Sequence, residues 1–122
     1  MKPGRTGLAR LFHALRYSAQ GFHAAWKNEA AFRQEVALVL VAFPASFWLA
    51  RSVEQWLLLI TPLMVLLTVE LLNSAIESVV DRFGGEMHEL SGRAKDMGSA
   101  AVLVCLLLGA MAWGSIAWKN LA

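Results

Sequence analysis

The chain has 122 residues, of which 57% are hydrophobic and only 16% are charged, and its mean hydropathy is +0.51. Soluble domains are about 45–50% apolar and about 25% charged, and a chain this short has too little interior to bury the surplus. The composition therefore indicates a membrane protein, and it argues against a disordered chain, a disulfide scaffold and a multidomain enzyme. The net charge of +2 gives no reason to expect a nucleic-acid partner.

The first predicted element is a helix over about residues 7–26 that lies in the membrane surface. At about 100° per residue, its large apolar side chains fall within one sector. These side chains are Leu8, Leu11, Phe12, Leu15, Ala19, Phe22 and Trp26, and the polar residues opposite them are Arg10, His13, Tyr17 and Gln20. An apolar stripe flanked by basic residues is typical of interfacial helices. A helix packed against another protein helix is the alternative.

Three apolar stretches follow and predict transmembrane helices over about residues 30–50, 53–82 and 92–118. The uncharged run 97–118 is long enough alone, because about 20 apolar residues cross a bilayer core of roughly 30 Å. The other two reach this length once a few flanking polar residues are included. Residues 1–122 are therefore predicted to form one all-α membrane domain, with a surface helix and three transmembrane helices.

The positive charges predict the orientation of these helices. Six of the eleven Lys and Arg residues precede the uncharged run 36–50, three lie between the uncharged runs 55–69 and 97–118, and only Arg51 and Lys119 remain for the other side. By the positive-inside rule, the N-terminus and the 81–96 loop face the cytoplasm. Four tryptophans then lie near the outer ends of the spans, as interfacial anchors do: Trp48, Trp56, Trp113 and Trp118.

The second predicted span carries a polar stripe, formed by Glu70, Asn73, Glu77 and Asp81. Their spacing places them within about 80° of one another on a helix, and Ser74 lies about 40° from Glu70. With a rise of 1.5 Å per residue, Glu70 lies about 26 Å from Val53, near the inner boundary of the hydrocarbon. A carboxylate at this depth costs a few kcal/mol and indicates a functional site. A purely structural hydrogen bond to a neighbouring helix is the alternative.

Clustered carboxylates and an amide suit a hard divalent cation such as Mg²⁺, and nearby Lys and Arg residues suit phosphate groups. The glycine-rich motifs of soluble nucleotide-binding proteins do not occur in the sequence. Two classes of function fit: an interfacial enzyme that joins a lipid to a water-soluble substrate, and a small proton- or cation-coupled transporter that uses Glu70. Transporter sites are expected near the bilayer midplane, so the position of the stripe favours the enzyme.

Three segments carry a resemblance to a known family. They are NEAAFRQE at 28–35, ELLNSAIESVVDR at 70–82 and ELSGRAKDMGSAA at 89–101. In these motifs, and in its length and layout, the chain closely resembles the bacterial integral-membrane diacylglycerol kinases. The resemblance implies a homotrimer in the inner membrane that uses ATP and Mg²⁺ to phosphorylate diacylglycerol to phosphatidate. Related members that act on undecaprenol keep an undecaprenol kinase open as an alternative.

The resemblance also implies roles for individual residues of this chain. Glu70 is implied as the base at the lipid hydroxyl, with Asn73 beside it, and Glu29 and Glu77 as the metal-binding carboxylates. The implied nucleotide contacts are Arg10, Tyr17, Glu29, Glu77, Glu86, His88, Lys95 and Asp96. The implied lipid contacts are Arg10, Ala14, Ala31, Glu35, Trp48, Trp56, Glu70, Ser99 and Trp113.

Overall fold

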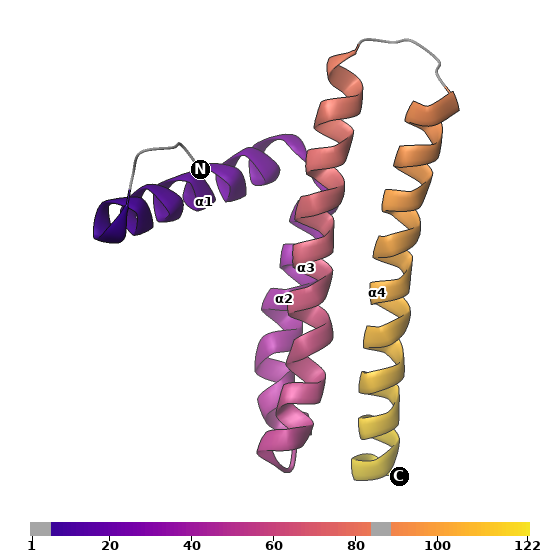
Figure 1. Cartoon of the computed structure of the whole chain (residues 1–122). Coiled ribbons are helices and arrows are strands. Elements are labelled where there is room, and N and C mark those ends of the chain that lie inside the picture. Colours follow the sequence, from indigo (N-terminus) through magenta and orange to yellow (C-terminus); the bar gives the residue numbers. More distant parts are fainter. Residues whose placement is uncertain (1–5, 84–88) are drawn as a thin grey trace.

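The computed structural model describes residues 6–83 and 89–122, and all the regular structure in them is helical. The helices are α1 (Gly7–Asn28), α2 (Ala30–Leu49), α3 (Val53–Arg82) and α4 (Glu89–Leu121). Figure 1 shows α2, α3 and α4 as a bundle, with α1 projecting to one side. The predicted all-α fold class is confirmed.

Three of these helices are long and apolar enough to cross a membrane, namely α2, α3 and α4. The mean hydropathies of their most apolar windows are 1.3, 1.9 and 2.2. A helix of 30 residues such as α3 is about 45 Å long, whereas the hydrocarbon of a bilayer is roughly 30 Å thick. Helix α3 therefore has room for one end that lies outside the hydrocarbon.

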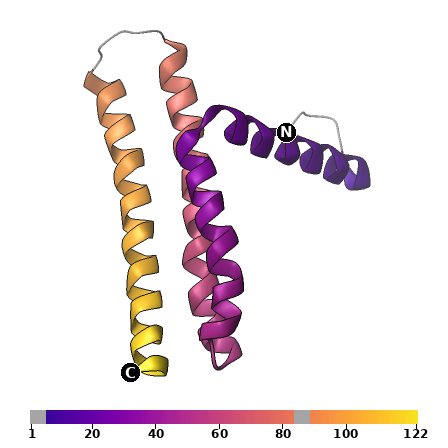
Figure 2. The same ribbon diagram turned by 180° about the vertical axis from the view of Figure 1, so that it is seen from behind.

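Helix α3 is the central element of the bundle. It packs along α4 and α2, whereas α2 and α4 contact each other little. Both views show α3 and α4 side by side and antiparallel, with α2 against the other flank of α3 (Figures 1 and 2). The polar stripe on α3 therefore lies where side chains from α2 and α4 can reach it.

The corner between α1 and α2 is stabilised by one arginine. Glu29 takes an extended conformation between the two helices. Arg33 of α2 reaches back, and its Nη1 donates to the carbonyl oxygens of Trp26 at 2.7 Å and Lys27 at 3.4 Å. The last carbonyls of a helix lack partners within the helix and carry partial negative charge, so a guanidinium is favourable there. Arg33 thereby helps to hold the end of α1 against α2.

The end of the bundle where α2 joins α3, here called the closed end, is tightly packed. Leu49, Leu59 and Ile116 form a buried hydrophobic cluster. The buried side chain of Asn120 donates through Nδ2 to the carbonyl oxygen of Leu49 and to Oε1 of Gln55, each at 2.8 Å. All three membrane-length helices are therefore joined at this end. The opposite end, with Arg82 and Glu89, is called the polar end.

Candidate active site

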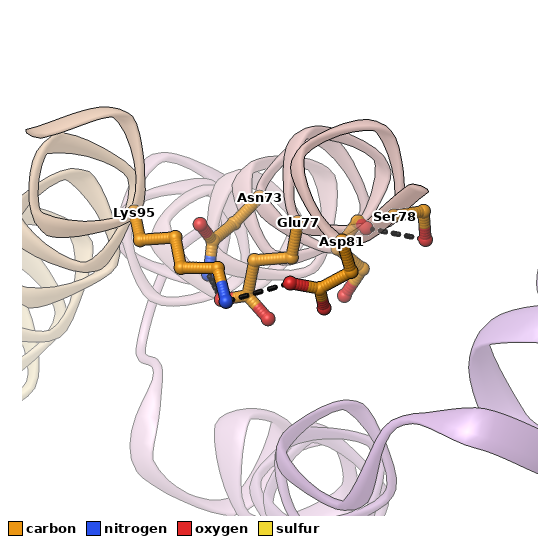
Figure 3. A network of polar contacts seen from close by, with 6 residues as sticks. Asn73, Glu77, Ser78, Asp81 and Lys95 are labelled. Atoms are coloured by element: carbon orange, nitrogen blue, oxygen red, sulfur yellow. Dashed lines mark hydrogen bonds and ion pairs between the residues drawn. The ribbon is translucent and has the colours of Figure 1, made fainter. Parts of the chain in front are cut away.

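The polar stripe of α3 lies on one face of the helix, in the half that leads to the polar end. Figure 3 shows Asn73, Glu77 and Asp81 directed to the same side of α3, where Lys95 approaches from α4. Burial falls along the stripe: Glu70 is 3% exposed, Asn73 and Glu77 are half-buried, and Asp81 is exposed. The stripe therefore runs from an enclosed carboxylate to the molecular surface.

Glu70 is the most enclosed charged residue among those the structure describes. Its Oε2 atom is buried and accepts no hydrogen bond from the described residues. Glu35 of α2 also has a buried Oε2 without a donor, and its carboxyl group lies close enough to interact electrostatically with Glu70. A carboxylate oxygen without a donor has a lone pair available to accept a proton, which is one requirement for a general base.

Asn73 lies between the enclosed and the exposed parts of the stripe. Its Nδ2 donates to Oε1 of Glu77 at 3.2 Å, and its Oδ1 is buried without a hydrogen-bond donor. Asn73 is also a polar neighbour of Glu70. One amide thus connects two carboxylates and orients the outer one.

Lys95 brings a positive charge from α4 to the exposed end of the stripe. Its Nζ lies 2.7 Å from Oδ1 of Asp81, and it also interacts electrostatically with Glu77 (Figure 3). Both side chains of the ion pair are largely exposed, with relative accessibilities of 44% and 63%. Exposed ion pairs contribute only about 0–1 kcal/mol, so Lys95 can exchange Asp81 for a more highly charged partner such as a phosphate at little cost.

A groove of about 450 Å³ lies between α1 and α3, beside the stripe. Its polar lining residues are Ser18, Asn28, Glu29, Ser74 and Ser78. The carboxylates of Glu29 and Glu77 both act electrostatically on Glu70. The sequence did not predict this groove, because it depends on how α1 packs against α3. It places Glu29 at the same site as the stripe.

The chain matches proteins of known family over nearly its whole length. The family model of prokaryotic diacylglycerol kinase matches residues 16–117. The chain belongs to the prokaryotic diacylglycerol kinase family. It is 50% identical over 120 residues to the diacylglycerol kinase of Escherichia coli (strain K12), a match that covers 98% of each chain. It is also 50% identical over 113 residues to that of Pseudomonas aeruginosa, covering 93% and 92% of the two chains.

A third relative is also a diacylglycerol kinase. The diacylglycerol kinase of Haemophilus influenzae is 47% identical over 111 residues, which cover 91% of this chain and 94% of the relative. The lipid-kinase family predicted from the three sequence motifs is therefore confirmed. Of the two classes of function left open by the sequence, the enzyme is favoured over the transporter.

The carboxylates at and beside the polar stripe are compatible with Mg²⁺. Within 6–83 and 89–122, no three His, Cys, Asp or Glu side chains come together as a metal cluster. Mg²⁺ usually takes only one or two protein carboxylates and completes its octahedron with phosphate oxygens and water. Glu29 and Glu77, which both interact electrostatically with Glu70, provide this number of carboxylates.

The structure does not bring every predicted nucleotide contact to the stripe. Arg10 is exposed, and the N-terminal half of α1 that carries it points away from α3 and α4 (Figures 1 and 2). Tyr17 is half-buried and stacks loosely on His13, with ring centroids 6.3 Å apart. Asp96 lines a separate hollow on α4 with Glu89 and Arg93. The predictions for Glu86 and His88 lie outside the described residues.

The predicted lipid contacts fall into two groups. Ala14, Ala31, Glu35 and Ser99 belong to α1 and to the halves of α2 and α4 nearer the polar end. Trp48, Trp56 and Trp113 lie toward the closed end, and Trp56 is about 21 Å along α3 from Glu70. Trp56 and Trp113 donate their indole N–H groups to Ser46 Oγ and to the Leu59 carbonyl oxygen, each at 3.0 Å. In one chain, these tryptophans cannot touch the same lipid head group as Glu70.

Proposed function

We propose that the chain is an ATP-dependent diacylglycerol kinase whose reaction takes place along the polar stripe of α3. The observation that carries the proposal is the gradient of burial from Glu70, enclosed and with an unpaired oxygen, to the exposed Lys95–Asp81 pair. A lipid hydroxyl can approach the enclosed end from the membrane, while a nucleotide can approach the exposed end from water. Phosphoryl transfer depends mainly on such positioning and on charge neutralisation.

The roles of the residues follow from this arrangement. The oxygen of the lipid hydroxyl attacks the γ-phosphorus of ATP, and Glu70 accepts the proton of that hydroxyl. The bond to the β–γ bridging oxygen breaks, so that phosphatidate and ADP are released with the proton left on Glu70. Lys95 neutralises phosphate charge, and Asn73 orients Glu77. Glu29 and Glu77 would hold Mg²⁺, which neutralises charge on the transferred phosphoryl group.

We further propose that the active enzyme is a homotrimer. One chain leaves many large apolar side chains uncovered, and the N-terminal half of its α1 helix points away from α3 and α4. Neighbouring chains would cover part of the apolar surface and bring an α1 helix to each site. In a single bundle Glu70 is enclosed, but Asn73 and Glu77 further along the stripe are only half-buried, and neighbouring chains would cover them. The mass of the purified protein in detergent, corrected for bound detergent, tests the trimer.

The proposed location is the bacterial inner membrane, with the N-terminus in the cytoplasm. The distribution of Lys and Arg supports this orientation by the positive-inside rule. With this topology the polar end faces the cytoplasm, where ATP is available. The apolar side chains of α1, such as Leu11, Leu15 and Phe22, are exposed in the single chain, as a helix lying in the membrane surface requires.

The deciding experiment uses the purified full chain in detergent micelles with labelled ATP, Mg²⁺ and diacylglycerol. We expect labelled phosphatidate to form, and its absence would refute the proposal. Glu70→Gln keeps the size of the side chain but removes the base, so turnover should fall by about 10²- to 10⁴-fold. ATP binding and assembly should be retained.

Glu54→Gln is the matched control for Glu70→Gln. It makes the same chemical change in the exposed first turn of α3, at the closed end, and should retain full turnover. Near-normal turnover in Glu70→Gln would remove Glu70 from the role of base. A parallel assay with undecaprenol in place of diacylglycerol identifies the preferred lipid.

A further inference from the structure

Gly98 of α4 is a buried glycine that packs directly against the side chain of Asn73. A Cβ atom on Gly98 would overlap Oδ1 of Asn73, and it would lie 3.0 Å from Cγ and 3.8 Å from Cβ of the same residue. Any other residue at position 98 would therefore displace Asn73 or push α4 away from α3. The absence of a side chain at this position is what allows the observed packing.

The other glycines of α4 do not show this relation. Gly92 and Gly114 have nothing within 4 Å of the position a Cβ would occupy, and Gly109 has only an ordinary contact at 3.8 Å to Pro62. Glycine in the middle of a helix is unfavourable because of the backbone entropy it loses on folding. Among the described glycines of α4, Gly98 is therefore the one whose close packing requires that no side chain be present.

The contact also explains the orientation of the Asn73 amide. Its Nδ2 donates to Glu77, while its Oδ1 is directed at the backbone of Gly98 and has no conventional donor. The Cα hydrogen that glycine has in place of a side chain faces this oxygen, and such Cα–H···O contacts recur where helices approach closely. The amide therefore has its NH₂ group toward Glu77 and its oxygen toward α4.

Gly98 shares a helix face with Lys95, because residues three apart are neighbours on a helix surface. Close approach at Gly98 therefore also determines how far Lys95 lies from Asp81 and Glu77 on α3. Asn73 and Lys95, two groups of the proposed site, both depend on this one point of contact.

We propose that Gly98 is a positioning residue for phosphoryl transfer, setting the orientation of Asn73 toward Glu77 and the position of Lys95. This rests on the proposed function, in which Glu77 holds the divalent cation. Gly98 itself touches no substrate. A methyl group at position 98 should therefore lower kcat and change the dependence of the rate on Mg²⁺, while the KM for lipid changes little.

The test compares Gly98→Ala with Gly92→Ala and Gly114→Ala in the purified full-length enzyme. For Gly98→Ala we expect kcat to fall by about 10- to 100-fold and the Mg²⁺ concentration for half-maximal rate to rise roughly tenfold. The KM for diacylglycerol should stay within about twofold, since lipid binding is not rearranged. The two controls should keep parental kinetics. Parental kcat and Mg²⁺ dependence in Gly98→Ala would overturn the proposal.

Measurements of Tm test the packing of Gly98 against Asn73 independently of the role of the metal. Gly98→Ala should lower Tm in the parental background but not in Asn73→Ala, where the side chain that the methyl would meet has been removed. Equal loss of Tm in both backgrounds would overturn the packing argument. If Gly98→Ala does not fold, folding of the double variant supports the contact and its failure to fold refutes it. Unchanged Mg²⁺ dependence in Glu77→Gln would instead refute the proposed metal ligand and leave the Tm coupling standing.

Discussion

The individual residues of the site differ in how firmly the fold holds them in place. Glu70 is held in the packed interior of the bundle, whereas Lys95 is held by an exposed ion pair. Burial keeps a carboxylate away from water and from competing donors, which suits a base. Exposure leaves a cation free to change partners, which suits a group that meets each new nucleotide. The two ends of the stripe therefore combine a fixed group with an adaptable one.

Replacement of Lys95 should affect the nucleotide more than the fold. In Lys95→Met the exposed ion pair with Asp81 is lost, so the free energy of unfolding should fall by less than about 1 kcal/mol. The loss of a charge-assisted contact to phosphate should raise the KM for ATP or lower kcat, reducing kcat/KM by about 10-fold or more. Steady-state kinetics with ATP as the varied substrate measure the effect.

Arg93→Met is the control for Lys95→Met. Arg93 also forms an exposed ion pair, at 3.3 Å to Glu89, but within its own helix. Its removal should leave kcat/KM for ATP close to the parental value. Equal losses in both variants would show that general positive charge on α4, and not Lys95, assists the nucleotide.

At the scale of elements, the sequence predicted which residues share a face of one helix better than it predicted the contacts between helices. Helical spacing alone placed Asn73 and Glu77 on one face, and the structure joins them by a hydrogen bond. The contact of Asn73 with Gly98 depends on the register of α3 against α4, which periodicity within one helix does not contain. The groove beside Glu29 likewise depends on the angle at which α1 leaves the bundle.

The corner at Arg33 gives a prediction about α1. Arg33→Ala removes the donor to the last carbonyls of α1, so α1 should become less firmly held while the bundle of α2, α3 and α4 stays folded. Hydrogen exchange should become faster in α1 and remain unchanged in α3. Kinase activity should fall several-fold, since α1 borders the groove that contains Glu29.

Lys27→Ala is the comparison for Arg33→Ala, because it removes a basic residue from the last turn of α1 but leaves the Arg33 contacts in place. It should show parental exchange rates and activity. If exchange in α1 is equally fast in both variants, the effect comes from the charge near the helix end and not from the specific contacts of Arg33.

At the scale of the whole molecule, stability and chemistry are concentrated at opposite ends. The closed end holds the hydrophobic cluster of Leu49, Leu59 and Ile116 and the hydrogen bonds of Asn120. The stripe lies in the half of the bundle that leads to the polar end, and the carboxylates at its enclosed end, Glu70 and Glu35, have buried unpaired oxygens. Unsatisfied buried groups cost stability, so a site that contains them needs support elsewhere. The sequence indicated the apolar spans but not this division, because Asn120 gives no periodic signal near the chain end.

The division predicts that the closed end can be weakened without a change in chemistry. Asn120→Ala removes the donor to the buried carbonyl oxygen of Leu49, while Oε1 of Gln55 keeps the backbone N–H of Arg51 as its donor. An unpaired buried acceptor costs about 1–3 kcal/mol. The thermal midpoint in micelles should fall, while kcat per folded molecule, measured well below that midpoint, should stay parental. Ser115→Ala, an exposed change in the last third of α4, should alter neither quantity. A lower kcat in fully folded Asn120→Ala would instead show that the closed end transmits its packing along α3 and α4 to Glu70 and Lys95, so that the two ends act as one unit.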